Sequence, residues 1–312
     1  MEDNKTIHDV VMIGAGPAAL AAAIYTTREE IETTLYEKGI VGGLAATTDW
    51  VDNYPGYTKG IEGMKLADEM RGQAERFGAK IEFGEVSKIE RNGDIIDLVV
   101  DDQPVQAKAV LIATGSEYKK LGVPGEAEYY ARGVHYCATC DGAFYKDRPI
   151  IAIGGGNSGV QEALFLTRFA SHVDLLVRSE LRASEVLQKE LRAMSDKITV
   201  HTNVLIDEVL GDGESAVGVR VTDKITGEKR EINADGMFVL IGLMPNTKFL
   251  ADSGIELDEV GLIKTDLNLE TSVKGVFAAG DVRSGATMQI ATAVGEGATA
   301  ALKIREYLES KI

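Results

Sequence analysis

Two glycine-rich segments constrain the fold of this chain more than any other feature. Residues 10–25 read VVMIGAGPAALAAAIY and residues 150–166 read IIAIGGGNSGVQEALFL. In each, an apolar run of strand length leads through glycines into a small-residue stretch with helical spacing, which is the pattern of a strand, a tight turn and a helix. Each is followed at a matching distance by another strand-like run, TTLYEKG or VDLLVRSE. The repeat predicts an α/β chain with two Rossmann-like nucleotide-binding domains.

The glycine positions in both segments have the spacing of a dinucleotide-binding turn. The first glycine permits the turn, the second lets a pyrophosphate approach the backbone, and a small third residue lets the helix pack against the strand. These positions are Gly14, Gly16 and Ala19 in the first segment and Gly154, Gly156 and Gly159 in the second.

The two segments differ where a ribose would be bound. The acidic residue expected about 20 residues beyond the first glycine is Glu37, whose carboxylate suits the hydroxyls of an unphosphorylated ribose. The alternative is a solvated acid at the end of a strand. The second segment has Val177 and Arg178 at this point, and an arginine suits a 2′-phosphate better than a free hydroxyl.

Three further segments flank the second glycine motif on both sides. They are the glycine-rich return at 42–56, the apolar run AVLIATG at 109–115, and TSVKGVFAAGD, in which Asp281 follows a buried strand. Each alone is compatible with an ordinary buried strand or surface loop. Together they predict a discontinuous nucleotide-binding domain, residues 1–117 and 246–312, with a second domain, residues 118–245, inserted into it. A supporting helix is expected that packs through the helically spaced residues Met64, Leu66, Ala67, Met70 and Ala74.

Cys137 and Cys140 are the only cysteines of the chain, and Asp141 follows them directly. A Cys-x-x-Cys loop can form and break a disulfide, and a neighbouring carboxyl group can carry protons as the dithiol forms. One alternative is a pair of inert buried cysteines with Asp141 as a helix cap. Another is a zinc site that uses His135 and a distant histidine, namely His8, His172 or His201. We interpret His135 as a packing residue and expect no metal.

Charge and composition narrow the possible partners. The chain has 33 basic and 49 acidic residues and a formal net charge of −16, which repels phosphate backbones and anionic lipids. We therefore expect neither nucleic acid nor membrane as a partner. MEDNKTIHDVVMIG lacks the basic and apolar regions of a signal peptide, and no window reaches about 18 consecutive apolar residues. A cytoplasmic location is expected, where a cysteine pair is more often catalytic or metal-binding than structural.

Several motifs together resemble one enzyme family, the low-molecular-weight, flavin-dependent thioredoxin reductases, which are class II pyridine nucleotide-disulfide oxidoreductases. In chain order the motifs are GAGPAAL, GGLAATTDWVDNYPG, IATGSEYKKLGVPGE, CATCDGAF, GGGNSG, IGLMPNT, GVFAAGDV and MQIATAVGEG, and they span essentially the whole chain. Larger, glutathione-reductase-like enzymes carry their cysteines just after the first Gly-Gly, where this chain has LAATTDW.

The resemblance implies a role for each matched residue. Cys140 would be the cysteine nearer the flavin, Cys137 the one that attacks the partner disulfide, and Asp141 the general acid. The implied contacts to non-covalently bound FAD are Gly14, Gly16, Ala19, Glu37, Gly43, Leu44, Asn53, Gly115, Asp281, Gln289 and Ile290. The implied nicotinamide nucleotide contacts are Gly154, Gly156, Asn157, Ser158, Gly159, Arg178 and Arg182. It further implies a homodimer, thioredoxin or a thioredoxin-like protein as acceptor, and two domains that rotate so that the cysteines alternate between flavin and thioredoxin.

The electron donor is where the chain departs from this family. NADPH is the family default, and its 2′-phosphate is usually clamped by His-Arg-Arg and a further arginine. Here the segment supplies Val177, Arg178, Ser179 and Arg182, and Met288 stands where an arginine often precedes Gln289. NADH, reduced ferredoxin and deazaflavin therefore stay open as donors. A non-enzymatic flavin-binding redox sensor is the alternative from another class of protein.

Overall fold

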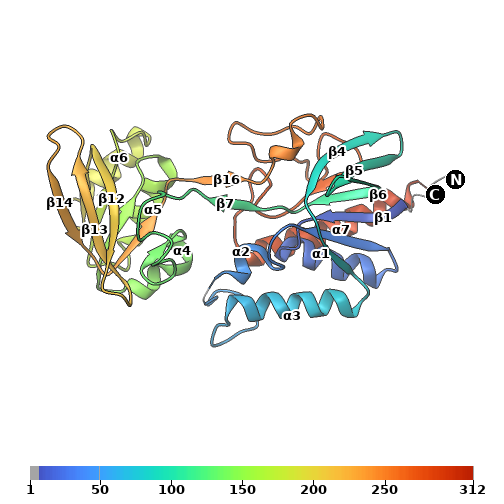
Figure 1. The fold of residues 1–312 in the computed structure, drawn as a ribbon, viewed down its shortest axis with the longest axis horizontal. Helices are drawn as coiled ribbons and strands as arrows, with labels where there is room; N and C mark the ends of the chain where they lie inside the picture. The colour runs from blue at the N-terminus through green and yellow to red at the C-terminus, as the bar shows by residue number, and fades with distance from the viewer. Residues whose placement is uncertain (1–6, 49, 312) are drawn as a thin grey trace. The chain divides into compact units, whose positions relative to one another are not determined.

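The computed structural model describes residues 7–48 and 50–311, which form two compact units. The discontinuous unit consists of residues 1–117 and 244–312, and the inserted unit of residues 118–243 (Figure 1). Residues 1–6, on which part of the signal-peptide argument rests, lie outside the described residues, as does Asp49 of the glycine-rich return.

The discontinuous unit is built on a seven-stranded sheet. The strands follow the order β3-β2-β1-β6-β5-β4, and β17 also pairs with β6. Their bounds are β1 Ile7–Ile13, β2 Thr33–Glu37, β3 Lys80–Phe83, β4 Val86–Asn92, β5 Ile95–Val100, β6 Gln103–Ile112 and β17 Val276–Ala278. The pairs formed by β1, β2, β3, β6 and β17 are parallel, whereas β4, β5 and the first half of β6 form an antiparallel meander. The ends of β1, β2, β6 and β17 therefore meet at one edge, where an α/β sheet binds its ligands.

Helices α1 (Pro17–Arg28), α3 (Gly63–Arg76) and α7 (Ile290–Glu309) pack together beside this sheet (Figure 1). Small residues let them approach closely, because a Cβ on Gly297 of α7 would lie 2.1 Å from the carbonyl oxygen of Ala18 in α1. The short helices are α2 (Gly43–Ala46) and η2 (Lys248–Leu250). Helix α3 buries Leu66, Ala67, Met70 and Ala74 as expected. The expectation for Met64 is wrong: it is 44% exposed, because it lies off the face that the other four share.

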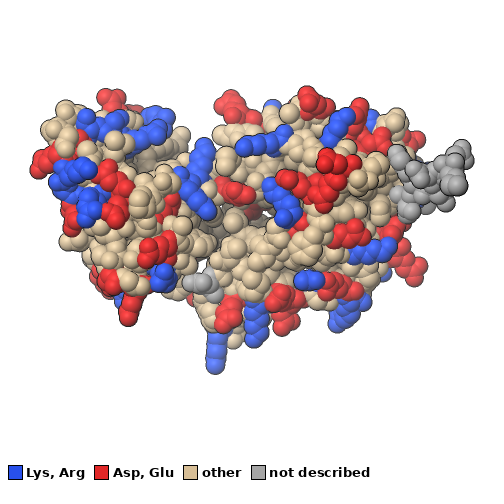
Figure 2. All heavy atoms as spheres, in the orientation of Figure 1, with Lys and Arg blue, Asp and Glu red and all other residues tan. Residues whose placement is uncertain are grey.

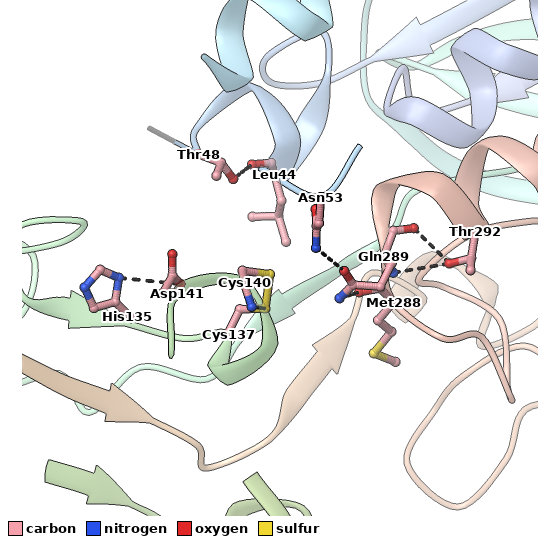
Figure 3. The surroundings of a disulfide bond; sticks show 10 residues. All are labelled: Leu44, Thr48, Asn53, His135, Cys137, Cys140, Asp141, Met288, Gln289 and Thr292. Carbon is pink, nitrogen blue, oxygen red and sulfur yellow. Dashed lines mark hydrogen bonds and ion pairs between the residues drawn. A yellow bond between two sulfur atoms is a disulfide. The ribbon is translucent and has the colours of Figure 1, made fainter. Parts of the chain in front are cut away.

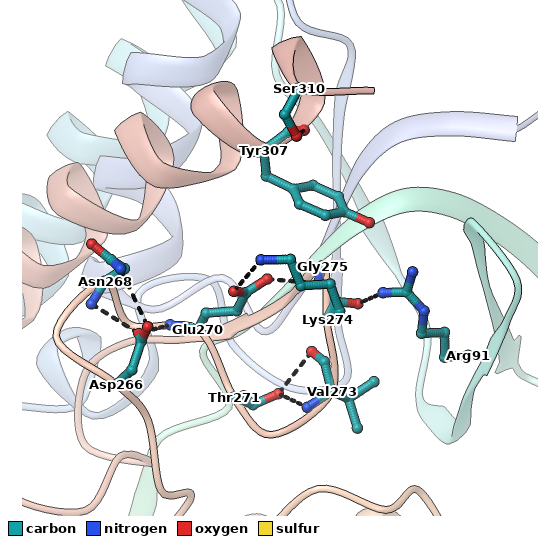
Figure 4. Close-up of polar contacts among 10 residues, drawn as sticks. All are labelled: Arg91, Asp266, Asn268, Glu270, Thr271, Val273, Lys274, Gly275, Tyr307 and Ser310. Carbon is teal, nitrogen blue, oxygen red and sulfur yellow. Dashed lines mark hydrogen bonds and ion pairs between the residues drawn. The ribbon is translucent and has the colours of Figure 1, made fainter. Parts of the chain in front are cut away.

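The loop before β17 is held by a cluster of backbone and side-chain hydrogen bonds (Figure 4). The Glu270 carboxylate accepts from the Gly275 N–H at 2.9 Å and from Lys274 Nζ at 2.8 Å, and Arg91 donates to the Lys274 carbonyl. Gly275 has φ +80°, and a Cβ there would meet the Tyr307 hydroxyl at 2.6 Å. The start of β17 is thus tied to β4 and α7, which fixes the strand that leads to Asp281.

The inserted unit has a five-stranded, all-parallel sheet in the order β11-β10-β9-β15-β8 and an antiparallel meander of β12, β13 and β14. The sheet strands are β8 Val134–His135, β9 Pro149–Ile153, β10 His172–Leu176, β11 Ile198–His201 and β15 Gly236–Val239. The meander strands are β12 Val204–Gly211, β13 Ala216–Asp223 and β14 Lys229–Asn233. The helices are α4 Ala138–Asp141, η1 Gly142–Tyr145, α5 Asn157–Leu166 and α6 Glu185–Ala193. An all-parallel sheet is buried on both faces, which explains the continuous apolar runs of β9 and β15.

The chain passes between the two units through β7 (Ser116–Tyr118) and β16 (Leu243–Pro245), which pair as a two-stranded ladder. Acidic and basic side chains are interspersed on the face shown in Figure 2. Within the described residues, no helix is long and apolar enough to cross a membrane. The fold class expected from the sequence, α/β with two Rossmann-like domains of which the second is inserted into the first, is confirmed.

Candidate active site

The first glycine turn joins β1 to α1 and leaves an open space at the helix N-terminus. Gly14 has φ +96°, its N–H donates to the Tyr36 carbonyl at 2.8 Å, and a Cβ there would lie 2.6 Å from the Ala113 carbonyl oxygen. A Cβ on Gly16, the N-cap of α1, would meet nothing within 4 Å. The first turn of α1 carries no acidic side chain, so its free N–H groups favour an anion such as a pyrophosphate. Ala19 is fully buried and serves helix packing.

Glu37 stands at the end of β2, and both of its carboxylate oxygens are held by backbone N–H groups. Oε2 accepts from Ala15 at 2.7 Å and Oε1 from Gly39 at 2.7 Å. The carboxylate is therefore anchored to the glycine turn instead of simply projecting into solvent. Its remaining lone pairs are available to ribose hydroxyls.

Asp281 follows β17 and carries a largely buried carboxyl group. Burial, and secondarily the negative charge of Glu296, raises the pKa of Asp281 to about 6. Within the described chain no hydrogen bond reaches the Asp281 carboxylate, although Ser116 Oγ donates to its backbone carbonyl at 2.5 Å. Glu296 instead accepts from the Gly280 N–H at 2.8 Å and pairs with Arg283 at 2.5 Å. A buried carboxyl group without a protein partner is suited to a ligand hydroxyl.

The start of α7 is tied to the glycine-rich return (Figure 3). Asn53 Nδ2 donates to Gln289 Oε1 at 3.0 Å, and Gln289 Nε2 donates to the Met288 carbonyl at 2.9 Å. The Gln289 N–H donates to Thr292 Oγ1 at 3.3 Å, and Ile290 is the first residue of α7. The structure thus brings together three of the residues implied by the resemblance.

Three other implied FAD contacts lie in nearby turns of the same unit. Gly43 has φ +56° and begins α2, which also carries the exposed Leu44. Gly115 has φ +64° and follows β6, where its carbonyl accepts from the Asn246 N–H at 3.1 Å. Positive φ at Gly43 and Gly115 explains the glycine at each position.

The second glycine turn repeats the geometry of the first in the inserted unit. The Gly154 N–H donates to the Leu176 carbonyl at 3.1 Å, and a Cβ on Gly154 would lie 2.3 Å from the Leu240 carbonyl oxygen. Gly156 is the N-cap of α5 and has open space beside it. Gly159 is buried, and a Cβ there would lie 2.9 Å from the same Leu240 oxygen.

The other implied nicotinamide contacts surround this second turn. Asn157 and Ser158 are exposed in the first turn of α5, and Asn157 Oδ1 accepts from the Ser184 N–H at 2.8 Å. Arg178 and Arg182 are exposed, and within the described residues neither guanidinium has a hydrogen bond or ion pair. The Arg182 N–H donates to the Gly155 carbonyl at 2.7 Å, which places that residue beside the turn.

Cys137 and Cys140 form a disulfide with an S–S distance of 2.10 Å. Strand β8 leads into the pair, Cys137 is the N-cap of α4, and its Sγ accepts from the Cys140 N–H at 3.2 Å. Both cysteines are partly exposed, so the alternative of a fully buried inert pair is wrong. A Cβ on Gly142 would lie 2.8 Å from Leu166 Cδ2, so the glycine lets α4 and η1 pack against α5.

Asp141 ends α4 and lies beside a buried histidine (Figure 3). His135 Nδ1 is 3.5 Å from Asp141 Oδ2, and His135 Nε2 is 2.7 Å from the Tyr145 hydroxyl. His135 is buried and stacked on Phe238, as expected of a packing residue. Its contact to Tyr145 had no sequence signal, because nothing in the sequence indicates that Tyr145 returns to β8. Within the described residues, no group of three or more His, Cys, Asp or Glu side chains is placed to hold a metal ion.

A second polar arrangement beside the cysteines had no sequence signal. The buried Glu126 carboxylate accepts from the N–H groups of Leu121 and Gly122, both at 2.7 Å, and from the Tyr136 hydroxyl at 2.9 Å. Tyr136 precedes Cys137, and its ring stacks on Tyr118. Glu126 therefore fixes the residue immediately before the disulfide.

Comparison with known proteins gives one consistent result. The family model described as pyridine nucleotide-disulphide oxidoreductase matches residues 8–297. A thioredoxin reductase of Bacillus subtilis is 42% identical over 99% of this chain and 97% of the relative, and one of Listeria monocytogenes is 40% identical over 99% and 96%. The crystal structure of thioredoxin reductase from Streptococcus pyogenes matches with a TM-score of 0.94 at 40% identity, covering 98% of this chain and 100% of that one.

The chain belongs to the pyridine nucleotide-disulphide oxidoreductase family and, within it, to the low-molecular-weight thioredoxin reductases. It is a flavin-dependent disulfide oxidoreductase with FAD as its cofactor. The resemblance seen in the sequence motifs is thereby confirmed.

Proposed function

We propose that residues 1–117 and 246–312 of this thioredoxin reductase bind FAD, and that residues 118–245 form the NAD(P)-binding-like domain that carries the redox-active disulfide. The support is the pairing of two glycine turns with one partly exposed disulfide, Cys137–Cys140, in the second unit. When bound, FAD supplies a two-electron carrier between the donor and the disulfide.

The residues of the discontinuous unit fit FAD. The open space at Gly16 suits the pyrophosphate, and the anchored Glu37 carboxylate suits the adenosine ribose. Asp281 offers a buried carboxyl group to a further ligand hydroxyl. The first N–H groups of α7 at Ile290, held in place through Gln289 and Asn53, favour a partly negative group of the ligand.

The chemistry of the cysteine pair follows from its position. In the dithiol form, the Cys137 thiolate attacks one sulfur of the thioredoxin disulfide, and the sulfur that leaves takes a proton from the Asp141 carboxyl group. The Cys140 thiolate then attacks Cys137 Sγ, which restores the internal disulfide and releases the second thioredoxin thiolate to be protonated by solvent. Two electrons pass to thioredoxin, and the chain is ready to be reduced again.

Replacement of each cysteine by serine tests these assignments. Cys140→Ser and Cys137→Ser should retain bound FAD and its reduction by the donor but lose thioredoxin reduction. Replacement of Thr139, exposed between the two cysteines, by serine is the matched control and should retain turnover. If Cys140→Ser kept thioredoxin reduction, the relay through the Cys137–Cys140 pair would be refuted.

NADPH is the default donor in this proposal, with Arg178 as the cation for its 2′-phosphate. One observation favours a donor other than NADPH, namely NADH or reduced ferredoxin. The residue before Arg178 is the buried, uncharged Val177, and the residue after Arg178 is Ser179. Anaerobic stopped-flow reduction of the flavin with NADPH, NADH and reduced ferredoxin separates the candidates. Slow bleaching at saturating NADPH, together with fast bleaching by another donor, would remove NADPH from the proposal.

The proposal includes a cytoplasmic homodimer with thioredoxin or a thioredoxin-like protein as its electron acceptor. A reversible dithiol needs a reducing compartment, which supports the cytoplasm. Light scattering on the purified flavoprotein tests the assembly, since the protomer mass is 33.5 kDa. A particle of protomer mass at micromolar concentration would contradict the dimer.

A further inference from the structure

His135 lies on β8, at the edge of the parallel sheet of the inserted unit, two residues before Cys137. Its ring stacks on Phe238 of the neighbouring strand, with centroids 5.3 Å apart and planes 29° apart. His135 and Phe238 are also paired in the strand register. Because the ring is packed on this side and buried, its orientation is fixed.

Both ring nitrogens of His135 have polar neighbours. Nε2 is 2.7 Å from the Tyr145 hydroxyl, and Nδ1 is 3.5 Å from Asp141 Oδ2 (Figure 3). Burial, and secondarily the charge of Asp141, raises the pKa of Tyr145 to about 12, so the phenol keeps its proton. When this phenol donates to Nε2, a neutral imidazole carries its own proton on Nδ1, facing Asp141.

We propose that His135 is a positioning residue for the general acid: its Nδ1–H, set by Tyr145, orients the Asp141 carboxyl group and stabilises its ionised form. The inference rests on the proposed role of Asp141. It assigns to His135 and Tyr145 a part in thioredoxin reduction that acts through Asp141 and not on the sulfurs.

The arrangement has a consequence for the proton step. When Asp141 gives its proton to the leaving thiolate, negative charge forms on the carboxylate, and the Nδ1–H of His135 stabilises it. The His135 and Asp141 side chains are 10% and 19% exposed, so the lost proton is replaced from solvent at Asp141. His135 and Tyr145 keep their protons throughout, and the step balances with one proton leaving Asp141 and one returning.

Other charged groups surround these residues. Arg148 and Asp235 act on Tyr145 with opposite signs, and Glu162 of α5 accepts from the Ala138 N–H at the start of α4. All of these groups are still present in a His135 variant, so a change in the pH dependence of the rate would report the loss of the imidazole.

Two amide substitutions separate the two nitrogens of the ring. The amide nitrogen of asparagine takes a position close to Nδ1, and that of glutamine takes a position close to Nε2. His135→Asn therefore keeps a donor toward Asp141, whereas His135→Gln keeps only the contact to Tyr145. A matched control is His201→Gln, because His201 Nε2 lies 2.7 Å from Asp174 Oδ1 on β10 and β11, at the opposite edge of the same sheet.

The measurement is the pH dependence of one turnover of the thiol exchange. Full-length flavoprotein reduced with dithionite is mixed with oxidised thioredoxin, quenched with acid, and its thiols are alkylated and counted by mass spectrometry. The rate should have a limb that falls at high pH, because the leaving thiolate takes its proton from the Asp141 carboxyl group. His135→Gln should move this limb to higher pH, since the carboxylate loses the Nδ1–H that lies 3.5 Å away. His135→Asn and His201→Gln should leave it in place.

The other outcomes distinguish this inference from the proposed function. Asp141→Asn should remove the limb; if it left the rate and the profile unchanged, both the role of Asp141 and this inference would be wrong. If Asp141→Asn removed the limb but His135→Gln left it unshifted, the inference alone would be overturned. Tyr145→Phe frees Nε2 to take the ring proton and should shift the limb in the same direction by a smaller amount, which keeps the test available if His135→Gln does not fold. A lower melting temperature without a shift in any variant would mean a structural role only.

Discussion

The two glycine turns of this chain are built alike but suit different ligands. In both, the N–H of the first glycine donates to the carbonyl near the end of the second strand, from Gly14 to Tyr36 and from Gly154 to Leu176. In both, the carbonyl of the residue after a neighbouring parallel strand leaves no room for a Cβ on that glycine. The backbone therefore sets the turn, and the side chains around it decide what binds.

The difference lies at the end of the second strand. The Glu37 carboxylate accepts from the Ala15 N–H, whereas Val177 is 3% exposed and fills the equivalent space. A Cβ on Gly155 would lie 2.4 Å from Val177 Cγ1, which explains a glycine where the first turn has Ala15. One exchange of an acid for a buried valine thus changes both the ligand chemistry and the composition of the turn.

The two parallel sheets also differ in the residue to which one corresponding strand leads. In the discontinuous unit, β17 pairs with β6 and leads to Asp281; in the inserted unit, β8 pairs with β15 and leads to Cys137. The same position in a parallel sheet thus leads to a proposed cofactor contact in one unit and to the Cys137–Cys140 disulfide in the other.

The largest effect is expected from Gly14→Ala, which breaks the shared turn. A side chain at φ +96° with its Cβ 2.6 Å from the Ala113 carbonyl oxygen is strained and must displace backbone. We expect the free energy of unfolding of the discontinuous unit to fall by about 3 to 5 kcal/mol, with loss of FAD. Gly154→Ala should disturb the inserted unit and leave the flavin spectrum intact. Denaturant titration followed by flavin absorbance measures both.

Gly16→Ala is the matched control for Gly14→Ala. Its φ is −77° and nothing lies within 4 Å of the added Cβ, so the free energy of unfolding of the apoprotein should change by less than about 1 kcal/mol. The affinity for FAD should still fall, because the methyl group enters the open space. Equal destabilisation by Gly14→Ala and Gly16→Ala would contradict the inference that Gly14 is needed for folding and Gly16 for FAD binding.

The sequence predicts the parts of this comparison that depend on periodicity and spacing. Apolar runs followed by glycines predict both strand–turn–helix units, and the position of Glu37 follows from its distance to the turn. Parallel pairing brings strand ends to one edge, so Asp281 is predicted to lie near the first turn although it is far away in sequence.

The remaining features depend on side-chain packing, which the spacing of apolar residues in the sequence does not predict. Glu126 is buried because three donors converge on it from two segments, and His135 meets Tyr145 only after η1 turns back over β8. Sequence reasoning treated His135 as packing because its partners are separated from it by irregular structure. The reason for Gly155 likewise appears only when the buried rotamer of Val177 is seen.

Asp281→Asn tests how much the buried carboxyl group lowers the stability of the discontinuous unit. The pKa of Asp281 is raised to about 6 in the folded chain, so the folded state binds more protons than the unfolded state between about pH 4 and 6. Stability of the apoprotein therefore falls as pH rises through this window, by up to about 3 kcal/mol. Asp281→Asn should remove that loss, so the apoprotein gains stability at pH 7 and changes little below pH 4.

The same substitution should weaken FAD binding, because an amide replaces the carboxyl group. Thermal unfolding of apoprotein and holoprotein at pH 4 and 7 measures both effects. Asp258→Asn is the control for a carboxylate that has protein partners, since hydrogen bonds from Ser284 and from backbone N–H groups lower its pKa. If Asp258→Asn also stabilised the apoprotein at pH 7, the effect of Asp281→Asn would not come from the lack of protein partners for the Asp281 carboxyl group.

Glu37→Gln addresses the ribose end of the comparison. The amide keeps the shape of the side chain but loses the charge-assisted hydrogen bonds, so FAD should bind about tenfold to a hundredfold more weakly, or 1.5 to 3 kcal/mol. Val177→Ala, at the corresponding position of the inserted unit, should lower stability through a cavity and leave FAD affinity unchanged. Equilibrium dialysis of FAD against both variants provides the measurement, and unaltered binding to Glu37→Gln would refute the ribose contact.

Ser179→Arg sharpens the comparison at the donor side and has the smallest expected effect. It adds a second cation beside Arg178, at the end of a strand where the side chains are exposed or partly exposed. One further charge-assisted contact to a 2′-phosphate should tighten NADPH binding by about 1.5 kcal/mol, roughly tenfold, and leave NADH binding unchanged. Arg178→Ala should act in the opposite direction with the same selectivity. Calorimetric titration of the oxidised enzyme with both nucleotides measures the difference. Equal changes in the affinities for NADPH and NADH would mean that the side chains at positions 178 and 179 do not face the phosphate. The nucleotide preference of the inserted unit would then come from the backbone turn alone.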